Sequence, residues 1–292
     1  MRGIILAGGS GTRLYPITKG ISKQLMPIYD KPMIYYPLST LMEANIRDVL
    51  IITTKEDQKD FKKLLGDGSQ FGIKINYEIQ KAPNGLAEAF LIGRDFIEDE
   101  SSAMALGDNI YFGNGFNQIL GKARKNASNG VASIFGFHVN DPKRFGIMEL
   151  DENNNVLSIE EKPEYPKSEI AITGLYFFPE GVYEYASRVK PSRRNELEIT
   201  SLIDMYRKEH RLDGLVLGSG FTWFDTGTND SMVEATNLIR GVQKNQDRII
   251  CSPEAIAYSK GWITTEQLSE QADQMLKNDY GRYLKKLTLK RQ

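Results

Sequence analysis

The sequence contains few of the residues that support thiol, zinc or histidine chemistry. Of its 292 residues one is a cysteine, Cys251, and two are histidines, His138 and His210. A single cysteine excludes an intrachain disulfide and a thiolate metal cluster. With so few histidines, zinc chemistry and a histidine-based catalytic triad are also disfavoured.

The chain also lacks a broad basic field and a long apolar run. Its formal net charge is -1, which argues against bulk nucleic-acid binding. The one basic cluster lies near the end and is consistent with a solvated helix face: Lys285, Lys286, Lys290 and Arg291. No apolar stretch is long enough to span a bilayer, and the N-terminus enters a strand without the layout of a signal peptide. We therefore expect a cytoplasmic enzyme that binds neither nucleic acid nor membrane.

Strand-like and helix-like patterns alternate in the first half of the chain. A length of 292 residues indicates one large domain or two ordinary ones, and a hydrophobic content of 40% indicates a globular protein. The expected strands are Gly3–Ala7, Val49–Thr53, Lys74–Ile79 and Ser102–Leu106. The expected helices begin at Pro32, at Asp57 (to Leu65) and at Gly85 (to Ile97). Such alternation predicts a mainly parallel sheet that binds ligands beyond the carboxyl ends of its strands.

The second half predicts strands that extend or cross this sheet, followed by helices. Strands are expected at Val131–His138, Gly146–Leu150, Val156–Glu161, Ile170–Phe178 and Gly214–Leu217, and helices at Glu180–Ser187, at Glu198–Glu209 and from Asn229 onward. The predicted fold is α/β, with a Rossmann-like mixed, mostly parallel central sheet flanked by helices and a helical C-terminal tail. We divide it into a catalytic domain, 1–240, and a helical extension, 241–292.

The first strand ends in a glycine-rich loop followed by an arginine. Gly8, Gly9 and Gly11 can bring backbone N–H groups close to an anion, and Arg13 adds a cation. The loop is not a dinucleotide fingerprint, because Leu14 occupies the third glycine position, and it lacks the lysine of a P-loop. A tight turn is the alternative, but three glycines after a buried strand favour a phosphate site.

A series of motifs resembles the sugar-nucleotidyltransferase family, most closely its glucose-1-phosphate thymidylyltransferases. "LAGGSGTRLYPIT" and "SKQLMPIYDKPMIYYPL" are followed in order by "PNGLAEAF", "LGDNIYFG", "EEKP", "TGLYFF", "ELEIT", "WFDTGT" and "GWI". The resemblance covers nearly the whole chain. It implies Mg²⁺-dependent transfer of the dTMP moiety of dTTP to glucose 1-phosphate, giving dTDP-glucose and pyrophosphate, as a first step towards dTDP-rhamnose and related deoxysugars. Use of UTP or another hexose phosphate, or a non-catalytic nucleotide-sugar-binding role, remain as alternatives.

The resemblance also assigns roles to individual residues. Arg13, Lys162, Asp108 and Asp225 are the expected catalytic residues, with Arg13 on the leaving pyrophosphate and Lys162 on the sugar phosphate. The nucleotide-binding set is Leu6, Gly8, Gly9, Ser10, Gly11, Thr12, Arg13, Lys23, Gln24, Gln80, Pro83, Gly85 and Asp108. The sugar-phosphate-binding set is Leu86, Asn109, Phe145, Gly146, Glu161, Lys162, Thr173, Gly174, Tyr176, Arg194, Thr200 and Trp223.

Asp108 and Asp225 are the expected magnesium ligands. Mg²⁺ prefers oxygen and is commonly held by one or two carboxylates together with substrate phosphates. Asp108 ends a predicted strand, and Asp225 follows the apolar "TWF", where an acidic group is otherwise costly. The alternative for each residue is a capping role. Asp108 would then be the capping residue in a turn, and Asp225 would cap a helix that starts at Thr226–Thr228.

Two positions depart from the family pattern, and the tail suggests assembly. Asn195 stands where the family usually has glycine, and Phe145 where it usually has tyrosine. The tail carries one apolar helical face, which the chain itself or another subunit must cover: Leu276, Tyr280, Tyr283, Leu284 and Leu287. By resemblance we expect a homotetramer, a dimer of dimers with the tail at one interface, and inhibition by dTDP-rhamnose at a site away from Asp108.

Overall fold

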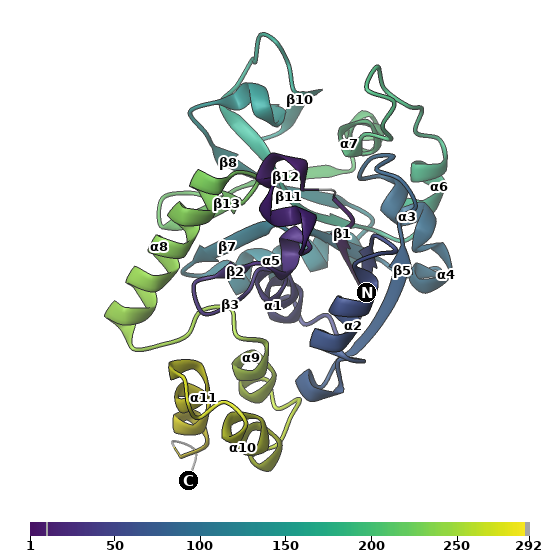
Figure 1. The fold of residues 1–292 in the computed structure, drawn as a ribbon. Coiled ribbons are helices and arrows are strands. Elements are labelled where there is room, and N and C mark those ends of the chain that lie inside the picture. The colour runs from purple at the N-terminus through teal and green to yellow at the C-terminus, as the bar shows by residue number, and fades with distance from the viewer. Residues whose placement is uncertain (10, 290–292) are drawn as a thin grey trace.

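A nine-stranded mixed sheet forms the centre of the molecule (Figure 1). The computed structural model describes residues 1–9 and 11–289. The parallel part consists of β1 (Arg2–Ala7), β4 (Asp48–Thr53), β5 (Lys74–Ile79) and β6 (Ser102–Leu106), in the order β6-β1-β4-β5. The predicted mostly parallel core is therefore confirmed for the first half of the chain.

The second half of the chain extends this sheet through an antiparallel strand. β11 (Ile170–Phe178) pairs antiparallel with β6 on one side and with β8 (Ala132–His138) and β9 (Gly146–Leu150) on the other. β10 (Val156–Glu161) follows β9, and β12 (Leu212–Val216) runs parallel to β8. The predicted strands of this half are confirmed to within two residues at their ends.

Helices cover both faces of the sheet, as the alternation along β1 requires. Ile5 and Ala7 belong to one core cluster, and Ile4 and Leu6 to the other, because successive strand side chains point to opposite faces. The first cluster packs α1 (Tyr35–Glu43), α2 (Gln58–Leu65) and α5 (Phe116–Ser128). The second packs α3 (Glu88–Ile92), α4 (Arg94–Ile97), α6 (Val182–Ser187) and α7 (Ile199–Lys208).

Two small sheets lie outside the main one. A hairpin is formed by β2 (Pro27–Ile28) and β3 (Lys31–Pro32). An antiparallel ribbon is formed by β7 (Asn109–Gly113), which follows β6 after a two-residue turn, and β13 (Phe221–Asp225). Neither β7 nor β13 was predicted from the sequence, and α5 was missed as well.

Two predicted helix starts are wrong. Pro32 lies in β3, and the helix begins three residues later at Tyr35 because Lys31–Pro32 pair across the hairpin. The segment predicted as one helix from Gly85 to Ile97 contains two short helices that meet at Gly93. Gly85 itself has φ +108°, a conformation outside the helical region.

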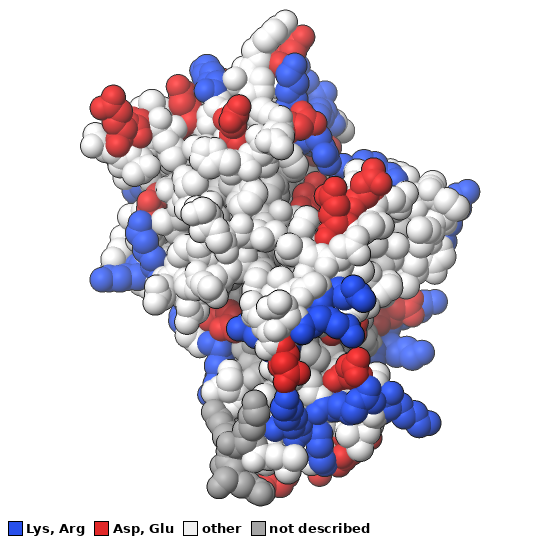
Figure 2. All heavy atoms as spheres, turned by 90° about the vertical axis from the view of Figure 1, so that its left-hand side faces the viewer, with Lys and Arg blue, Asp and Glu red and all other residues white. Residues whose placement is uncertain are grey.

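The C-terminal segment is helical and packs against the rest of the chain. α8 (Asn229–Gln246) runs across the proposed boundary at residues 240/241 and is followed by α9 (Pro253–Ser259), α10 (Thr265–Asp273) and α11 (Asp279–Leu289). Figure 1 shows the last three below the sheet, and Figure 2 shows basic side chains beside acidic ones over this region. Among the described residues, no helix is long and apolar enough to cross a membrane.

The apolar face of the tail is covered by the chain itself. Tyr280 and Leu284 are buried in the same core cluster as β1 and α1, and Tyr283 and Leu287 pack against it. Leu276 precedes α11 and is 42% exposed, so the prediction that all five share one helical face is wrong for this residue. Of the predicted basic cluster, Lys290 and Arg291 lie outside the described residues.

Candidate active site

The candidate site lies where β1 and β6 end side by side. The glycine-rich loop follows Ala7, and Gly107-Asp108 follow β6, as predicted for the carboxyl ends of parallel strands. The backbone N–H of Gly107 donates to Leu6 O (2.9 Å), which holds the two ends together. Gly11 has φ +60°, and Ser10 lies outside the described residues.

Two adjoining cavities open at this edge of the sheet. The smaller, about 200 Å³, is lined by Leu6, Gly8, Gly9, Gln24, Gln80, Pro83, Gly85, Leu86, Leu106, Asp108 and Glu196. The larger, about 570 Å³, is lined by Arg13, Leu86, Leu106, Asp108, Asn109, Arg144, Phe145, Gly146, Glu161, Lys162, Ile172, Gly174, Tyr176, Arg194, Glu196, Glu198, Ile199, Thr200, Trp223 and Asp225. Asp108 lies on the wall that the two share.

The predicted nucleotide-binding set divides into cavity-lining residues and residues behind them. Most of the set lines the smaller cavity, whereas Arg13 faces the larger one. Gly11, Thr12 and Lys23 are outside both linings. Lys23 lies behind Asp108 and forms an ion pair with it.

The predicted sugar-phosphate-binding set lines the larger cavity, with one exception. On β11, Ile172, Gly174 and Tyr176 face the cavity. Thr173 is fully buried and, by strand alternation, points to the opposite face of the sheet. Thr173 is therefore the one member of this set that does not line the cavity.

Asn109 organises the strand ends around the cavity. Its Oδ1 accepts hydrogen bonds from Trp223 Nε1 (2.6 Å) and from the backbone N–H of Gly174 (3.2 Å), and its Nδ2 donates to Asp108 Oδ1 (3.0 Å). One buried amide thus connects β7, β11 and β13 to the acidic group. Asn109 therefore has a structural role, whereas the sequence suggested only a contact with the sugar.

Asp108 and Asp225 are brought together by the ribbon. Asp225 pairs with Asn109, the neighbour of Asp108, in the β13–β7 ladder. The next residue, Thr226, donates both its backbone N–H (3.1 Å) and its hydroxyl (2.7 Å) to Asp108 O. The alternative prediction that Asp225 caps a helix is wrong, because α8 begins at Asn229 and Thr228 is its cap.

The two carboxyl groups have opposite pKa shifts. Burial alone would raise the pKa of Asp108, but the charge of the Lys23 ammonium and the hydrogen bonds from Lys23 and Asn109 together outweigh it, and the pKa lies below its usual range. Burial, and then the Asp108 carboxylate, raise the pKa of Asp225. Asp225 is therefore an acidic group that lacks sufficient positive charge around it.

This donor set fits a hard divalent cation. Mg²⁺ prefers oxygen ligands, and it is commonly held by one or two carboxylates while phosphates and water complete its coordination sphere. The described residues hold no group of three or more acidic, histidine or cysteine side chains that could bind a metal alone. Asp108 and Asp225 are therefore suited to a cation that arrives with a phosphate ligand.

Two glycines allow side chains of the site to pack directly against the backbone. A Cβ at position 8 would come within 2.8 Å of Gln80 Oε1, and one at position 227 within 2.8 Å of an Arg13 guanidinium nitrogen. The Gln80 amide is fixed by donating from Nε2 to Glu88 Oε2 (2.8 Å) and to Gly85 O (3.3 Å). The Gln80 carbonyl and the Arg13 guanidinium are thus held against bare backbone.

A backbone clasp connects the nucleotide side to the sugar side. The Leu197 N–H donates to Asn84 O (2.6 Å), and Leu197 O accepts from the Ala87 N–H (3.1 Å). Gly85 lies inside this clasp, where a Cβ would come within 2.4 Å of Leu197 O. The clasp places the 84–87 loop and the 194–198 loop on either side of the shared wall.

Arg194 is surrounded by carboxylates on the sugar side. Its guanidinium contacts Glu198 (2.9 Å), Glu161 (3.2 Å) and Glu196 (3.2 Å). Thr200 donates to the other oxygen of Glu161 (3.1 Å). Burial, and then Glu198, raise the pKa of Glu161. Arg194 therefore balances an acidic group of three carboxylates at the cavity wall.

The two family departures are accommodated by the structure. Asn195 has φ +62°, the left-handed region that glycine favours and asparagine tolerates best among other residues. Phe145 packs its ring edge on Trp223 at 5.3 Å between centroids. The backbone turn beside Arg194 and the aromatic wall are both retained.

Arg144 and Glu198 line the site but were not predicted. Arg144 precedes Phe145, with its guanidinium carbon 5.4 Å from that ring centre, and faces the cavity that holds Asp225. Glu198 lies four residues after Arg194 and binds it. The spacing of a cation and a carboxylate was a usable signal for Glu198, whereas no pattern in the sequence separates Arg144 from a surface arginine.

Comparisons with known proteins show what the chain is similar to. Residues 2–241 match the family model described as nucleotidyl transferase. A glucose-1-phosphate thymidylyltransferase from Neisseria meningitidis is 53% identical over 99% of this chain and 100% of that protein. One from Xanthomonas campestris pv. campestris is 54% identical over 97% of this chain and 95% of that protein.

Solved structures share the fold. A Bacillus anthracis protein described as a candidate glucose-1-phosphate thymidylyltransferase superposes with a TM-score of 0.75 at 38% identity, over 82% of this chain and 95% of that one. A UDP-glucose pyrophosphorylase bound to UDP-glucose superposes with a TM-score of 0.72 at 25% identity, over 85% and 99%. The chain therefore belongs to the nucleotidyl transferase family and, within it, to the glucose-1-phosphate thymidylyltransferases.

Proposed function

We propose that the two cavities hold dTTP and glucose 1-phosphate, and that the site transfers dTMP between them to give dTDP-glucose and pyrophosphate. The observation that carries this proposal is the shared wall. Asp108 borders both cavities, so an α-phosphorus bound beside it is within reach of a group in either one. The larger cavity also presents Arg13 and Lys162 as separate cations.

The reaction needs no general base. The second pKa of a phosphate monoester is about 6, so the attacking sugar-phosphate oxygen is already anionic at neutral pH. The difficulty is to bring two anions together and to release pyrophosphate. Catalysis then depends on positioning and charge neutralisation, which fits a site built from Arg, Lys and Asp side chains.

On the nucleotide side, the backbone N–H groups of the glycine-rich loop bind the triphosphate. Gln24, Gln80 and Gly85 contact the base from the smaller cavity. Arg13 lines the larger cavity, with its guanidinium packed against Gly227, and there its charge meets the departing pyrophosphate.

On the sugar side, Lys162 binds the phosphate and Glu161 accepts hydrogen bonds from sugar hydroxyls. Lys162 is 45% exposed at its side chain, and its backbone N–H donates to Phe145 O (3.0 Å). Arg194 holds Glu161 in place (3.2 Å) and adds a second cation near the phosphate. The Phe145 and Trp223 rings form an apolar wall for the sugar.

Asp108 and Asp225 would hold Mg²⁺. When bound, the cation supplies positive charge to the phosphates of the nucleotide. Lys23 contributes its own charge to Asp108 and keeps this carboxylate ionised and fixed. Asp225 is held by the β13–β7 ladder opposite Asn109.

The test is pyrophosphate release, measured for a matrix of nucleoside triphosphates against sugar 1-phosphates, with and without Mg²⁺. We expect the highest kcat/KM for dTTP with glucose 1-phosphate and none without the metal. A preference for UTP or for another hexose phosphate would replace the proposed substrates. Binding of dTDP-glucose without turnover of any pair would indicate a non-catalytic relative.

We also propose a cytoplasmic homotetramer, a dimer of dimers, that dTDP-rhamnose inhibits away from Asp108. The family resemblance supports this proposal, and the exposed Leu276 and Leu289 leave apolar surface on the tail for a neighbouring subunit. Light scattering on the full chain tests the assembly, and a monomer contradicts it. Inhibition that is purely competitive with dTTP, with one binding site per chain by calorimetry, contradicts the separate site.

A further inference from the structure

The β2–β3 hairpin carries a buried lysine that the reaction does not use. The Lys31 side chain is 1% exposed, and it lines neither of the two cavities. Lysine is among the residues that are least often buried, because its charge must leave water. Such a group is retained in a core only when its partners hold it in a defined place.

Its partners come from four elements of the chain. Lys31 Nζ donates to Asp30 Oδ1 (2.6 Å) within the hairpin and to Gln243 Oε1 (3.2 Å) near the end of α8. Gln243 Nε2 returns a hydrogen bond to Asp30 Oδ2 (2.8 Å). The ammonium also lies 4.9 Å from the ring centre of Tyr36 on α1 and 5.9 Å from that of Tyr280 on α11.

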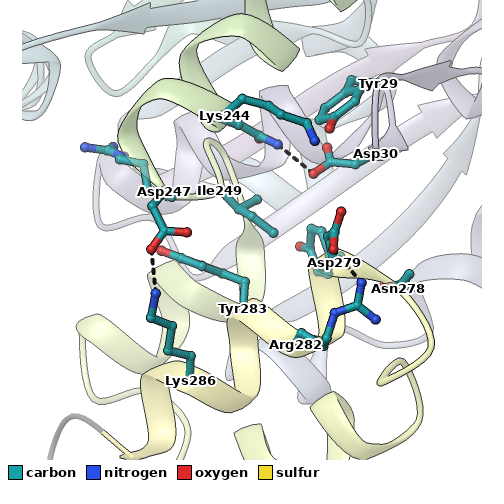
Figure 3. Close-up of a pocket in the computed structure, with 13 residues that line it drawn as sticks. Tyr29, Asp30, Lys244, Asp247, Ile249, Asn278, Asp279, Arg282, Tyr283 and Lys286 are labelled. Carbon is teal, nitrogen blue, oxygen red and sulfur yellow. Dashed lines mark hydrogen bonds and ion pairs between the residues drawn. The ribbon is translucent and has the colours of Figure 1, made fainter.

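The tail side of this cluster is fixed in turn. The Tyr280 hydroxyl donates to Glu254 Oε2 (2.5 Å) and contacts Ser252 Oγ (2.8 Å), both in the segment that begins α9. Figure 3 shows Tyr29 and Asp30 of the hairpin facing Asp279 and Arg282 of α11 across a cavity of about 570 Å³. The hairpin is therefore held by the C-terminal helices from one side.

The other end of the hairpin is the nucleotide side of the active site. The Met33 N–H donates to Met26 O (2.9 Å), and the Ile34 N–H donates to Gln24 O (2.8 Å). The Met26 N–H donates to Lys23 O (3.1 Å). Gln24, which contacts the base, and Lys23, which pairs with Asp108, are thus connected by backbone hydrogen bonds to the two ends of the hairpin. Lys31 holds the turn of this hairpin.

We propose that Lys31 is a positioning residue for nucleotide binding, which fixes Lys23 and Gln24 by anchoring the hairpin to the C-terminal helices. This rests on the proposed use of Lys23 and Gln24 for dTTP. It gives the tail a role in substrate binding within its own chain, because Tyr280 and Gln243 hold the same ammonium.

The test separates positioning from stability by removing both charges together. Lys31→Met alone leaves the partly buried Asp30 without its cation, which is destabilising. The double variant Asp30→Asn/Lys31→Met keeps the volumes and removes the pair, which is much less costly. Lys277→Met, the same substitution at an exposed position just before α11, serves as the matched control.

We expect the double variant to raise the KM for dTTP about 2- to 30-fold, the range over which packed networks modulate a distant site. The KM for glucose 1-phosphate stays at the parent value, and so do both constants in the control. Calorimetric titration with dTTP should show the same loss of affinity. Tyr280→Leu, which removes the ring from the tail side, should shift the same constant in the same direction.

Several results would overturn the assignment. A folded double variant with the parent KM for dTTP, or an equal rise in both KM values, contradicts a role in nucleotide positioning. If the double variant does not fold, a folded Tyr280→Leu chain that keeps the parent KM for dTTP also contradicts this role. A parent chain that binds no dTTP contradicts the proposed function itself, and is recognised before any variant is measured.

Discussion

Asn109 lies opposite Asp225 in the β7–β13 ladder while its side chain donates to Asp108, so a single asparagine is adjacent to both acidic residues of the site. The two carboxylates are more than a hundred residues apart in the chain, Asp108 in the turn before β7 and Asp225 at the end of β13. Their meeting depends on the pairing of a short ribbon and not on the central sheet. The ribbon therefore determines where a metal and the reacting phosphate can be placed.

Loss of either carboxylate should strongly impair turnover. Asp108→Asn and Asp225→Asn should each cost at least about 2 kcal/mol of transition-state stabilisation, the usual scale of an electrostatic contact to developing charge. The measurement is kcat/KM for both substrates under limiting Mg²⁺, with Asp99→Asn, on the surface, as control. Parent rates in both variants would contradict the metal assignment.

The same substitution at Asp225 should stabilise the metal-free fold. Burial and Asp108 raise the pKa of Asp225, so the folded chain holds this proton more tightly than the unfolded chain. Stability then falls as the pH rises from the unfolded pKa through the folded one, and ionised Asp225 is unfavourable at neutral pH. Asparagine removes this loss.

Calorimetry at pH 7 to 8 in the presence of a chelator should accordingly give a higher Tm for Asp225→Asn than for the parent. Added Mg²⁺ should raise the Tm of the parent more than that of the variant, since binding to the folded state stabilises it. A lower Tm of the variant in chelator would show that Asp225 is already compensated by Lys23 and Arg13.

The two phosphate cations should have separable kinetic effects. Lys162→Ala should raise the KM for glucose 1-phosphate more than the KM for dTTP, because Lys162 lies on the sugar side of the cavity. Arg13→Ala should chiefly lower kcat, because its contact strengthens as pyrophosphate leaves. Steady-state kinetics with each substrate varied measures this. Identical effects of both changes on both substrates would remove the distinction.

Asn195 should tolerate only residues that accept a left-handed backbone. Asn195→Gly keeps the turn at φ +62° and should leave kcat/KM within about twofold of the parent, a difference under 0.5 kcal/mol. Asn195→Val places a β-branched residue there at a cost of about 1–2 kcal/mol and should raise the KM for glucose 1-phosphate by displacing Arg194. Equal KM values for both variants would show that Arg194 does not depend on this turn.

The strands of the central sheet were predictable from their apolar residues. β5, β6, β9, β10 and β11 have the predicted bounds: β6 and β11 are mostly buried apolar runs, whereas apolar and polar residues alternate along β5. β7 and β13 were missed for a different reason. They lie outside the main sheet, and their glycine and polar residues give weak alternation.

Most residues that line the two cavities were named from the sequence, but their arrangement was not. The glycine loop and Asp108 follow strands of one sheet, so their proximity could be expected from topology alone. The pairing of Asp225 with Asn109, the three carboxylates around Arg194 and the cavity-facing Arg144 depend on how distant loops pack. No local pattern records such contacts.

The clasp around Gly85 has a consequence for how the chain tolerates mutation. Its two hydrogen bonds join main-chain atoms of residues 84, 87 and 197, which a change of side chain at those positions leaves in place. Gly85 is different, because any Cβ there meets the Leu197 carbonyl. A saturation scan of residues 81–85 under selection for activity should therefore give a profile that is permissive at exposed Lys81 and Ala82 and closed at position 85, where every codon except those for glycine is lost.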